Sequence, residues 1–340
     1  MKKTLFIGVL MLLLPTFSLL AQKIESNNRL NSGGYNYWLY TPGPSKSDTV
    51  ENQAKPLVIF LHGKSLSGTD LNRVRRYGTI DAIERGNEID AYVIAPQSPG
   101  GGWAPYKVWD IVEHVKATCN IDTNRIYCLG MSMGGYGTFS MASAYPDKIA
   151  AAMPLCGGGH SLDYAALNRI PIWIVHGTAD KAVPESCSKN ILKGMDNNGD
   201  CSRVRYTPLR GQNHSILARC FYLPQVYQWL FAHNLQDSNR VMCTDYDITV
   251  ADLSGAYSHA TQARGSVPVL RSSGAPVLEA PSTQASTSRP SSGKEYYTIK
   301  SGDTLSGIAK KKHTTVKKLC QLNGLSATST LKVGKKIRVK

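Results

Sequence analysis

The segment Gly130-Met131-Ser132-Met133-Gly134 places a serine between two glycines with the spacing G-x-S-x-G. It follows an apolar run, 125–129, and precedes a helix-like stretch, 135–145, that Pro146 ends. A sharp turn from strand to helix requires small residues two positions on either side of the serine. The hydroxyl of Ser132 would then lie exposed at the end of a strand, beside the positive end of a helix. The pattern therefore predicts a nucleophilic serine.

Two residues downstream have the types and positions needed to activate this serine. A serine hydroxyl is a poor nucleophile unless an imidazole accepts its proton and a carboxylate orients the imidazole. In hydrolases with this turn, the chain order is serine, acid, histidine. Asp180 follows the apolar run 172–175, and His214 follows the run 204–209. We therefore predict a catalytic triad of Ser132, Asp180 and His214.

Other residues are alternatives for the acid and the base. Asp163 is the alternative acid, although it follows the strand-like run 150–155 by several residues. The alternative bases are His160, His176 and His233. His176 ends a predicted strand and is more typical of a structural histidine, and His233 ends a predicted helix, where we expect an exposed side chain.

Acyl transfer also needs donors for the negative charge that develops on the carbonyl oxygen. One donor is predicted to be the backbone N–H of Met133, the residue after the nucleophile. The second is predicted to be the backbone N–H of Lys64, in the loop after the apolar run 57–61, with Ser65 as the alternative. We expect His62 to support this loop rather than to take part in the reaction.

Residues 22–236 alternate apolar runs of strand length with amphipathic stretches. The predicted strands are 57–61, 91–95, 125–129, 150–155, 172–175 and 204–209, and the predicted helices are 108–115, 135–145 and 226–233. Continuous apolar strands that alternate with helices predict an α/β fold with a doubly wound, mostly parallel sheet covered on both faces. Ligands bind such sheets beyond the carboxyl ends of the strands, where the candidate triad lies.

The rest of the chain divides by composition. Residues 261–293 are rich in Ser, Thr, Pro, Gly and Ala. Such a segment buries too little apolar surface to offset its ordering entropy, so it is predicted to be a flexible linker. Residues 237–260 are ambiguous, and a tail packed on the first domain and tied there by Cys243 is one interpretation.

Most of the net charge of +15 belongs to the C-terminal segment, because residues 294–340 hold 12 basic and 2 acidic residues. The main body is close to neutral, which argues against nucleic acid as its partner. The basic segment also lacks interleaved aromatic residues, so we do not expect it to bind nucleic acid either.

The N-terminus resembles a secretory signal. Two lysines precede the apolar run 5–14, and Ala21 is a candidate last residue of a signal peptide spanning residues 1–21, although Leu19 stands where a small residue is expected. An uncleaved anchor is the alternative, but the apolar run is short for a membrane span. We predict export to the periplasm, cell envelope or medium, without a stable membrane span.

Eight cysteines follow the predicted signal, and an exported chain is permitted disulfides. Cys128 and Cys156 lie in strand-like contexts and are predicted to be small buried residues. The better disulfide candidates are Cys187, Cys201, Cys220 and Cys243. No C-x-x-C pair with metal spacing occurs, so we predict no metal site. The predicted chemistry needs no cofactor, and none is expected.

Taken in order, these motifs resemble one branch of the α/β-hydrolases. The resemblance also rests on Pro96-Gln97-Ser98-Pro99, Gly101-Gly102-Trp103, Arg125-Ile126-Tyr127, Cys156-Gly157-Gly158-Gly159 and His176-Gly177. The branch contains secreted esterases similar to feruloyl and acetyl-xylan esterases and polyhydroxybutyrate-depolymerase-like enzymes, and some members are labelled predicted peptidases. The resemblance covers residues 30–235. It implies an α/β-hydrolase fold in which the Trp103 loop and the loop from Cys156 to His160 line the pocket for the acyl or alcohol group. Plain packing is the alternative for Trp103, and a tight turn is the alternative for the glycines 157–159.

Residues 294–340 resemble a LysM domain, a small α+β module with the order strand, helix, helix, strand (βααβ). The resemblance rests on Tyr297-Thr298-Ile299, the stretch 301–309, Asn323-Gly324 and the closing stretch 331–337. LysM domains bind glycans that contain N-acetylglucosamine, such as peptidoglycan or chitin. The residues that would contact sugar by resemblance are Gly302, Asp303, Thr304, Leu305, Asn323 and Leu325, and a structural turn or cap is the alternative for each.

The sequence thus predicts an exported serine hydrolase, by preference a carboxylesterase, tethered to peptidoglycan or a related glycan. Its expected partners are an ester, either a small molecule or an acylated glycan, and the glycan bound by the LysM domain. A serine peptidase with the same triad is one alternative. A glycan-binding protein with a vestigial hydrolase domain is the other.

Overall fold

The computed structural model describes residues 22–44, 53–260, 267–271, 296–299, 303–312, 314–323, 325, 331 and 334–339. They belong to two compact units, Met1–Leu278 and Glu279–Lys340, which are described separately. The predicted signal peptide, residues 1–21, and the candidate sugar contact Gly302 lie outside the described residues.

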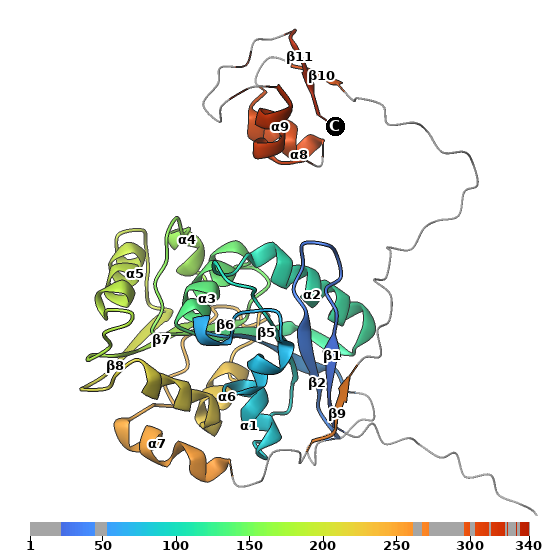
Figure 1. Ribbon diagram of the computed structural model, residues 1–340. Helices are drawn as coiled ribbons and strands as arrows, with labels where there is room; N and C mark the ends of the chain where they lie inside the picture. Colours follow the sequence, from blue (N-terminus) through green and yellow to red (C-terminus); the bar gives the residue numbers. More distant parts are fainter. Residues whose placement is uncertain are drawn as a thin grey trace, which may run out of the picture. The chain divides into compact units, whose positions relative to one another are not determined.

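The first unit is built on one mostly parallel sheet (Figure 1). Among its described residues, nine strands follow the order β8-β7-β6-β5-β3-β4-β2-β1-β9. The strands are β1 (Lys23–Asn27), β2 (Tyr37–Thr41), β3 (Lys55–Leu61), β4 (Tyr92–Pro96), β5 (Ile121–Met131), β6 (Ala151–Leu155), β7 (Ile172–Gly177), β8 (Val204–Leu209) and β9 (Val269–Arg271). All pairs from β4 to β8 are parallel, whereas β2 pairs antiparallel with both β1 and β4. This confirms the predicted fold class.

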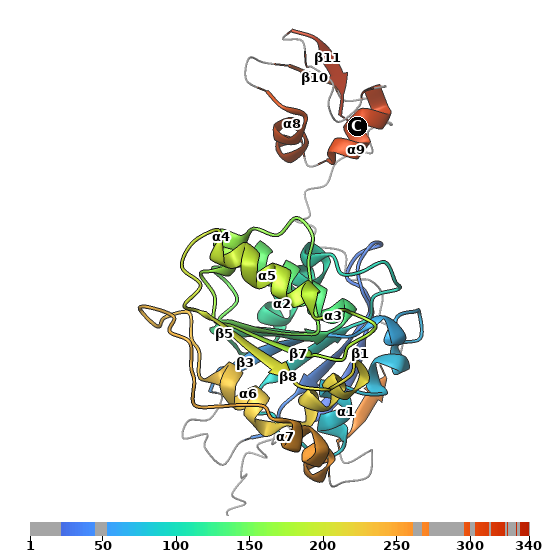
Figure 2. The ribbon, with the colours of Figure 1, turned by 90° about the vertical axis from the view of Figure 1, so that its left-hand side faces the viewer.

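Helices cover both faces of the sheet (Figure 2). One face carries α2 (Pro105–Thr118), α3 (Met133–Ala144), α4 (Tyr164–Leu167) and α5 (Ser186–Asp196). The other face carries α1 (Thr79–Glu84), α6 (Pro224–Phe231), α7 (Val250–Gly255) and the 3-10 helix η3 (Ser215–Tyr222). Three further 3-10 helices are η1 (Lys64–Leu66), η2 (Leu71–Arg75) and η4 (Ala256–His259).

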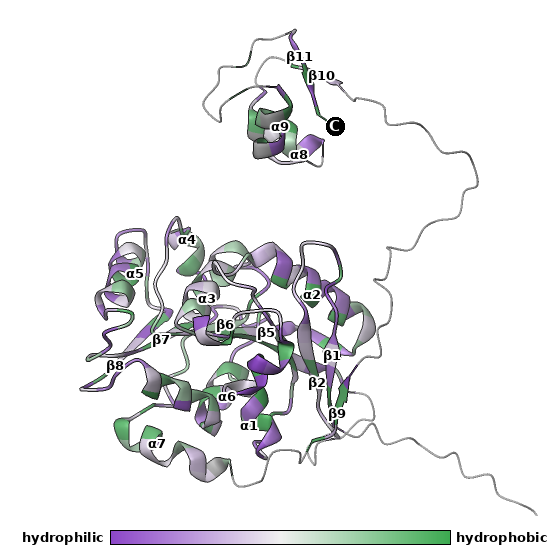
Figure 3. Ribbon diagram, viewed as in Figure 1, coloured by the Kyte–Doolittle hydropathy of each residue, from purple (hydrophilic) through white to green (hydrophobic). Residues whose placement is uncertain are grey.

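The central strand β3 shows why its sequence is apolar throughout. Successive side chains of a strand point to opposite faces. Val58 and Phe60 enter the core under α1 and α6, whereas Ile59 and Leu61 enter the core under α2 and α3. Helices α2 and α5 carry both hydrophobic and hydrophilic residues (Figure 3), as expected for helices with one face on a core.

Residues 237–260 belong to the first unit, but no disulfide ties them to it. The backbone N–H of Cys243 donates to Nε2 of His233 over 3.1 Å, and Trp229 Nε1 donates to the carbonyl oxygen of Cys243 over 3.1 Å. The expectation of an exposed His233 is therefore wrong, because its side chain is buried between α6 and this tail.

Part of the predicted flexible linker is ordered. Val269–Arg271 forms β9 and pairs in parallel with β1. Strands β1 and β2 were not predicted. Strand β1 is mixed in polarity and lies toward one edge of the sheet, whereas β2 is a fully buried run rich in aromatic residues whose strand signal was overlooked.

The eight cysteines, all within the described residues, are free thiols. The expectation that Cys187, Cys201, Cys220 and Cys243 are disulfide candidates is therefore wrong. Cys220 is fully buried in a hydrophobic core, as are Cys128 and Cys156, for which burial was predicted.

The second unit contains β10 (Tyr296–Thr298), α8 (Leu305–Lys311), α9 (Val316–Asn323) and β11 (Lys336–Arg338). The two strands pair antiparallel. Its core includes Tyr297, Ile299, Leu305, Ile308, Leu319, Ile337 and Val339. The observed order is the predicted strand, helix, helix, strand. In the part of the chain that the structure describes, no helix combines the length and the apolar character needed to cross a bilayer.

Candidate active site

Ser132 lies at a strained turn between β5 and α3. It is the N-cap of α3 with φ 59° and ψ −122°, a left-handed conformation that a non-glycine residue rarely adopts. A Cβ added at Gly134 would lie 1.8 Å from the carbonyl oxygen of Leu61, and one added at Gly130 would lie 2.5 Å from the same oxygen. The two glycines of the motif therefore allow the turn to pack against the end of β3.

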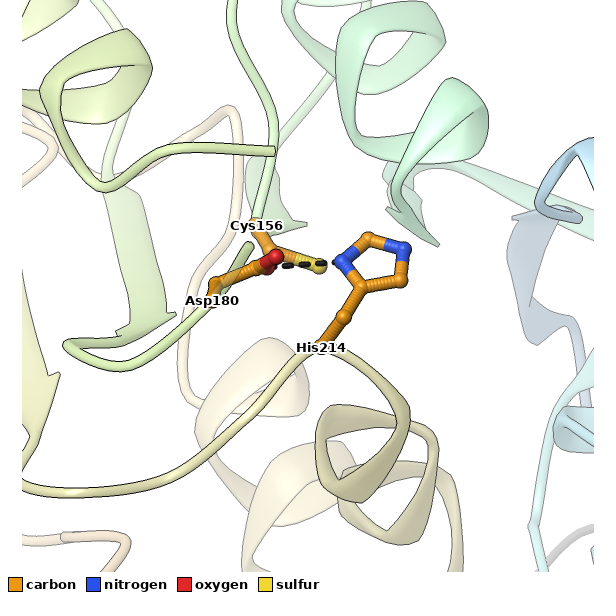
Figure 4. Close-up of side chains that lie close together, drawn as sticks. All are labelled: Cys156, Asp180 and His214. Atoms are coloured by element: carbon orange, nitrogen blue, oxygen red, sulfur yellow. Dashed lines mark hydrogen bonds and ion pairs between the residues drawn. The ribbon is translucent and has the colours of Figure 1, made fainter. Parts of the chain in front are cut away.

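Asp180 and His214 form a hydrogen-bonded pair at the same edge of the sheet (Figure 4). Asp180 lies just beyond β7, and its Oδ2 is 2.6 Å from Nδ1 of His214. The other carboxylate oxygen accepts the backbone N–H groups of Ala182 and Val183, each over 2.9 Å. Because the carboxylate is held from both sides, it fixes the imidazole with Nδ1 as donor and Nε2 available as a base.

A pocket of about 1080 Å³ brings the predicted groups together. Ser132, His214, Met133 and Lys64 all line it. Within residues 53–260, no hydrogen bond links the Ser132 hydroxyl to the imidazole of His214. Such catalytic hydrogen bonds are often long in unliganded hydrolases and tighten when substrate binds.

The two predicted oxyanion donors lie at helix starts. Met133 is the first residue of α3 and Lys64 is the first residue of η1. The first N–H groups of a helix have no partner within the helix, so they can donate to a ligand. A Cβ added at Gly63 would lie 3.5 Å from Cβ of Ser132, so the loop before Lys64 passes directly beside the serine.

His62 supports the loop that carries Lys64 through hydrogen bonds to two loops. Its Nε2 accepts the backbone N–H of Ser98 over 3.1 Å, and its Nδ1 donates to the carbonyl oxygen of Gly63 over 2.7 Å. Burial lowers the pKa of His62 to about 4. The ring is therefore neutral near pH 7 and links two loops without carrying charge.

The resemblance places the loop from Cys156 to His160 along the substrate pocket, but it does not predict that the Cys156 thiol lies beside Asp180 and His214; only the burial of Cys156 was predicted. Its Sγ, a carboxylate oxygen of Asp180 and a ring nitrogen of His214 all lie within 4.8 Å of one another (Figure 4). Burial, and next the charge of Asp180, raise the pKa of the thiol well above its ordinary value, so it stays protonated. Its place directly after β6, the neighbour of β5, is the sequence signal that points to the site.

These three side chains are also the group of candidate metal ligands found among the described residues. Bonds of about 2.0–2.3 Å in a tetrahedral site require donors roughly 3.3 Å or more apart. The 2.6 Å between Asp180 and His214 is a hydrogen-bond distance. A metal ion would have to break that bond, so the arrangement suits proton transfer better.

The alternative acid and bases have other places. Asp163 caps α4, where its Oδ1 accepts the backbone N–H of Ala166 over 3.0 Å. His176 is fully buried behind Asp180: its Nε2 lies 3.6 Å from Asp180 Oδ2, and its ring nitrogens lie 2.7 Å from Ser188 Oγ and 2.9 Å from the carbonyl oxygen of Val183, so it supports the acid and does not line the pocket. His160 lines the pocket.

Trp103 both packs and lines the pocket. It makes edge contacts with Tyr35 and His62, and its Nε1 donates to the carbonyl oxygen of His62 over 3.3 Å. A Cβ at Gly137 would lie 2.5 Å from its ring, so α3 approaches Trp103 closely. The two interpretations of this residue are therefore compatible.

The candidate sugar contacts of the second unit differ in their surroundings. Leu305 is buried in the core. The Asn323 amide donates to the carbonyl oxygens of Leu319 and Arg338, each over 2.8 Å, and accepts the backbone N–H of Arg338 over 2.7 Å. Asn323 therefore joins α9 to β11.

The other contacts lie nearer the surface. Thr304 is exposed, and its Oγ1 accepts the backbone N–H of Gly307 over 3.1 Å at the start of α8. Asp303 accepts the hydroxyl of Tyr297 over 3.0 Å, and Leu325 packs against the core while half-buried.

Comparison with known families agrees with this architecture. Residues 106–219 match the dienelactone hydrolase family, and residues 297–340 match the LysM domain. The chain therefore combines an α/β-hydrolase domain with a LysM domain.

Three curated relatives are similar to the hydrolase part. Poly(3-hydroxyalkanoate) depolymerase C of Paucimonas lemoignei is 27% identical over 175 residues, which are 46% of this chain and 39% of the relative. The bifunctional acetylxylan esterase/xylanase XynS20E of Neocallimastix patriciarum is 27% identical over 188 residues, 52% of this chain and 26% of the relative. Feruloyl esterase B of Talaromyces funiculosus is 28% identical over 177 residues, 48% of each chain. The chain spans less than half of the length of each.

A solved structure described as a thermostable esterase has a TM-score of 0.51 with this chain. It is 27% identical and covers 64% of each chain. The similarity supports the assignment of the first unit to the α/β-hydrolase fold.

Proposed function

We propose that the chain is a serine carboxylesterase that works through an acyl-enzyme intermediate, with Ser132, Asp180 and His214 as the triad. The observation that carries the proposal is the 2.6 Å hydrogen bond between Asp180 and His214 in the pocket that Ser132 lines. Names of the similar proteins, which describe esterases and a polyester depolymerase, support an ester rather than another acyl substrate.

In the proposed reaction, Nε2 of His214 accepts the Ser132 proton while Oγ forms a bond to the ester carbonyl carbon. The backbone N–H groups of Met133 and Lys64 hold the oxyanion. The tetrahedral intermediate collapses, and the bond to the alcohol oxygen breaks as His214 returns its proton to that oxygen. Water then attacks the acyl-serine by the same route, which releases the acid and restores Ser132.

The LysM domain supports a role on a glycan surface. We propose that it tethers the enzyme to peptidoglycan or a related glycan and so raises the enzyme's local concentration near its substrate. Export to the envelope or medium is part of this proposal, because that is where such a glycan occurs. Sedimentation of the full chain with insoluble peptidoglycan, and its release by soluble N-acetylglucosamine oligomers, would test the tether.

The central test is labelling by a fluorophosphonate probe together with hydrolysis of p-nitrophenyl esters and peptide anilides. The wild-type chain should be labelled and should hydrolyse esters, and Ser132→Ala should lose both activities. Ser140→Ala is the matched control, because Ser140 lines the same pocket but its hydroxyl donates to the carbonyl oxygen of Tyr136 over 3.0 Å.

Three outcomes contradict the proposal. Cleavage of peptide anilides without ester turnover would indicate a serine peptidase. Labelling that persists in Ser132→Ala would identify another nucleophile. A wild-type chain that binds glycan but is neither labelled nor active would indicate a glycan-binding protein without catalysis.

A further inference from the structure

The proposed oxyanion donor Lys64 belongs to a loop, residues 62–66, whose backbone has to be held in place for catalysis. Donors that are oriented before the reaction stabilise the transition state without the cost of reorganisation. The start of this loop is fixed through His62. Its other side contacts the segment 71–77, which comprises η2 and the two residues after it.

Two hydrogen bonds join this segment to Ser65, the residue after Lys64. Nη2 of Arg73 donates to the carbonyl oxygen of Ser65 over 2.8 Å, and the hydroxyl oxygens of Ser65 and Tyr77 lie 2.9 Å apart. The Tyr77 hydroxyl also lies against the residue before Lys64, because a Cβ added at Gly63 would be 3.1 Å from its oxygen. Tyr77 therefore contacts the chain on both sides of the Lys64 N–H.

Tyr77 makes these contacts at the point where the loop passes the nucleophile. It lines the same pocket as Ser132, and the Cβ added at Gly63 would also lie 3.5 Å from Cβ of Ser132. Burial raises the pKa of Tyr77 above its ordinary value, so the hydroxyl stays protonated. A neutral hydroxyl can donate one hydrogen bond and accept others, which suits a group that fixes two neighbouring residues of a loop.

We propose that Tyr77 is a positioning residue of the oxyanion hole, whose hydroxyl holds Gly63 and Ser65 and so directs the Lys64 N–H between them toward the oxyanion. The hydroxyl acts through the loop and not on the ester. Its loss therefore weakens binding of the transition state and leaves binding of the ester unchanged. The inference rests on the proposed esterase function, because Lys64 is a donor in that reaction.

Tyr77→Phe tests the inference in the full chain, because it removes the hydroxyl and keeps the ring. With p-nitrophenyl acetate, kcat should fall by roughly 10- to 100-fold with KM unchanged, since small displacements of a catalytic group cost about that much. Phenylboronic acid forms a tetrahedral adduct with a catalytic serine and so resembles the transition state. Its inhibition constant should rise by a similar factor.

Ser65→Ala tests the same hydrogen bond from the other side, because it keeps the backbone of the loop and removes the second hydroxyl. It should also lower kcat and weaken inhibition by phenylboronic acid. The double variant should lose no more than Tyr77→Phe alone, since the two substitutions remove one shared bond. Ser65 is exposed, so this variant tests the bond even where Tyr77→Phe does not fold.

Tyr227→Phe is the matched control. It removes another hydrogen bond between two hydroxyls, 3.1 Å from Tyr227 to Oγ1 of Thr79, and Tyr227 is not among the residues that line the pocket of Ser132. This variant should lose stability and keep both kcat and inhibition by phenylboronic acid.

Wild-type kcat in Tyr77→Phe, or a lower kcat with unchanged inhibition by phenylboronic acid, would overturn the inference and leave the esterase proposal intact. Equal losses of kcat in Tyr77→Phe and Tyr227→Phe would also overturn it, because they would trace the loss to stability. A wild-type chain that hydrolyses no ester and is not labelled by fluorophosphonate would overturn both proposals.

Discussion

The backbone N–H of Ser98 donates to Nε2 of His62, so the loop after β4 is fastened to the loop that carries the proposed oxyanion donor Lys64. This bond exists only while His62 is neutral at Nε2. Protonation of His62 at Nε2 would place its N–H against the backbone N–H of Ser98, and it would leave a positive charge in a buried site. The support of the oxyanion loop is thereby linked to pH.

The first prediction is that the free energy of unfolding decreases in acid, because His62 must remain unprotonated in the folded chain. His62 has a folded pKa of about 4, lowered by burial, and an unfolded pKa of about 6.5. The unfolded chain therefore binds more protons between these values, and stability falls as the pH falls from about 6.5 to 4. His62 alone contributes about 3 kcal/mol to this fall. Burial also lowers the pKa values of His176 and His233, so they add to the effect.

Urea unfolding followed by tryptophan fluorescence measures this, because all five tryptophans lie in the first unit. His62→Gln removes the titrating group but keeps a polar side chain. The stability difference between wild type and this variant should shrink as the pH approaches 4. A difference that stays constant from pH 7.5 to pH 4 would contradict the prediction.

Asp180→Asn should lower kcat by roughly 10³- to 10⁴-fold with little change in KM. The amide oxygen can still accept the N–H groups of Ala182 and Val183, which leaves the amide nitrogen facing His214. That nitrogen donates to Nδ1 and forces the proton onto Nε2, so the imidazole cannot accept the Ser132 proton. Steady-state ester kinetics measure the effect. Asp163→Asn, at the cap of α4, should retain activity. A decrease in kcat below tenfold for Asp180→Asn would argue against Asp180 as the triad acid.

Cys156 is predicted to position the pair of Asp180 and His214. Cys156→Ala opens space beside their hydrogen bond, and small displacements of reacting groups cost about 10- to 100-fold in rate. We therefore expect a lower kcat, an unchanged KM and a modest loss of stability. Cys220→Ala is the matched control, because it removes an equally buried thiol from the same unit. It should lose similar stability and keep kcat. Equal kcat values for the two variants would show that Cys156 only fills space.

Sequence reasoning predicted those parts of the site whose structure is determined by residues close together in the chain. Ser132 is marked by glycines that the turn requires, and β3 by an apolar run that burial on both faces requires. The place of the Cys156 thiol beside Asp180 and His214 depends on which strands become neighbours, and the sequence marks it only by the position of Cys156 directly after β6. Strand β9 has three residues and is stabilised by its pairing with β1, so its own sequence does not predict it.

The last prediction concerns Asn323, a candidate sugar contact whose amide joins α9 to β11. Asn323→Ala removes the amide that bonds the backbone N–H and carbonyl oxygen of Arg338, and the loss of each hydrogen bond at a partly buried site costs about 1 kcal/mol. We expect the second unit to unfold more readily and glycan binding to weaken as a result. Hydrogen exchange followed by mass spectrometry on peptides from 296–339 should show faster exchange, whereas tryptophan fluorescence and ester turnover should not change. Lys318 is an exposed residue of α9, and Lys318→Ala should change neither the hydrogen exchange of the second unit nor its glycan binding. Weaker binding to peptidoglycan with unchanged exchange would instead mean that the Asn323 side chain contacts the sugar directly.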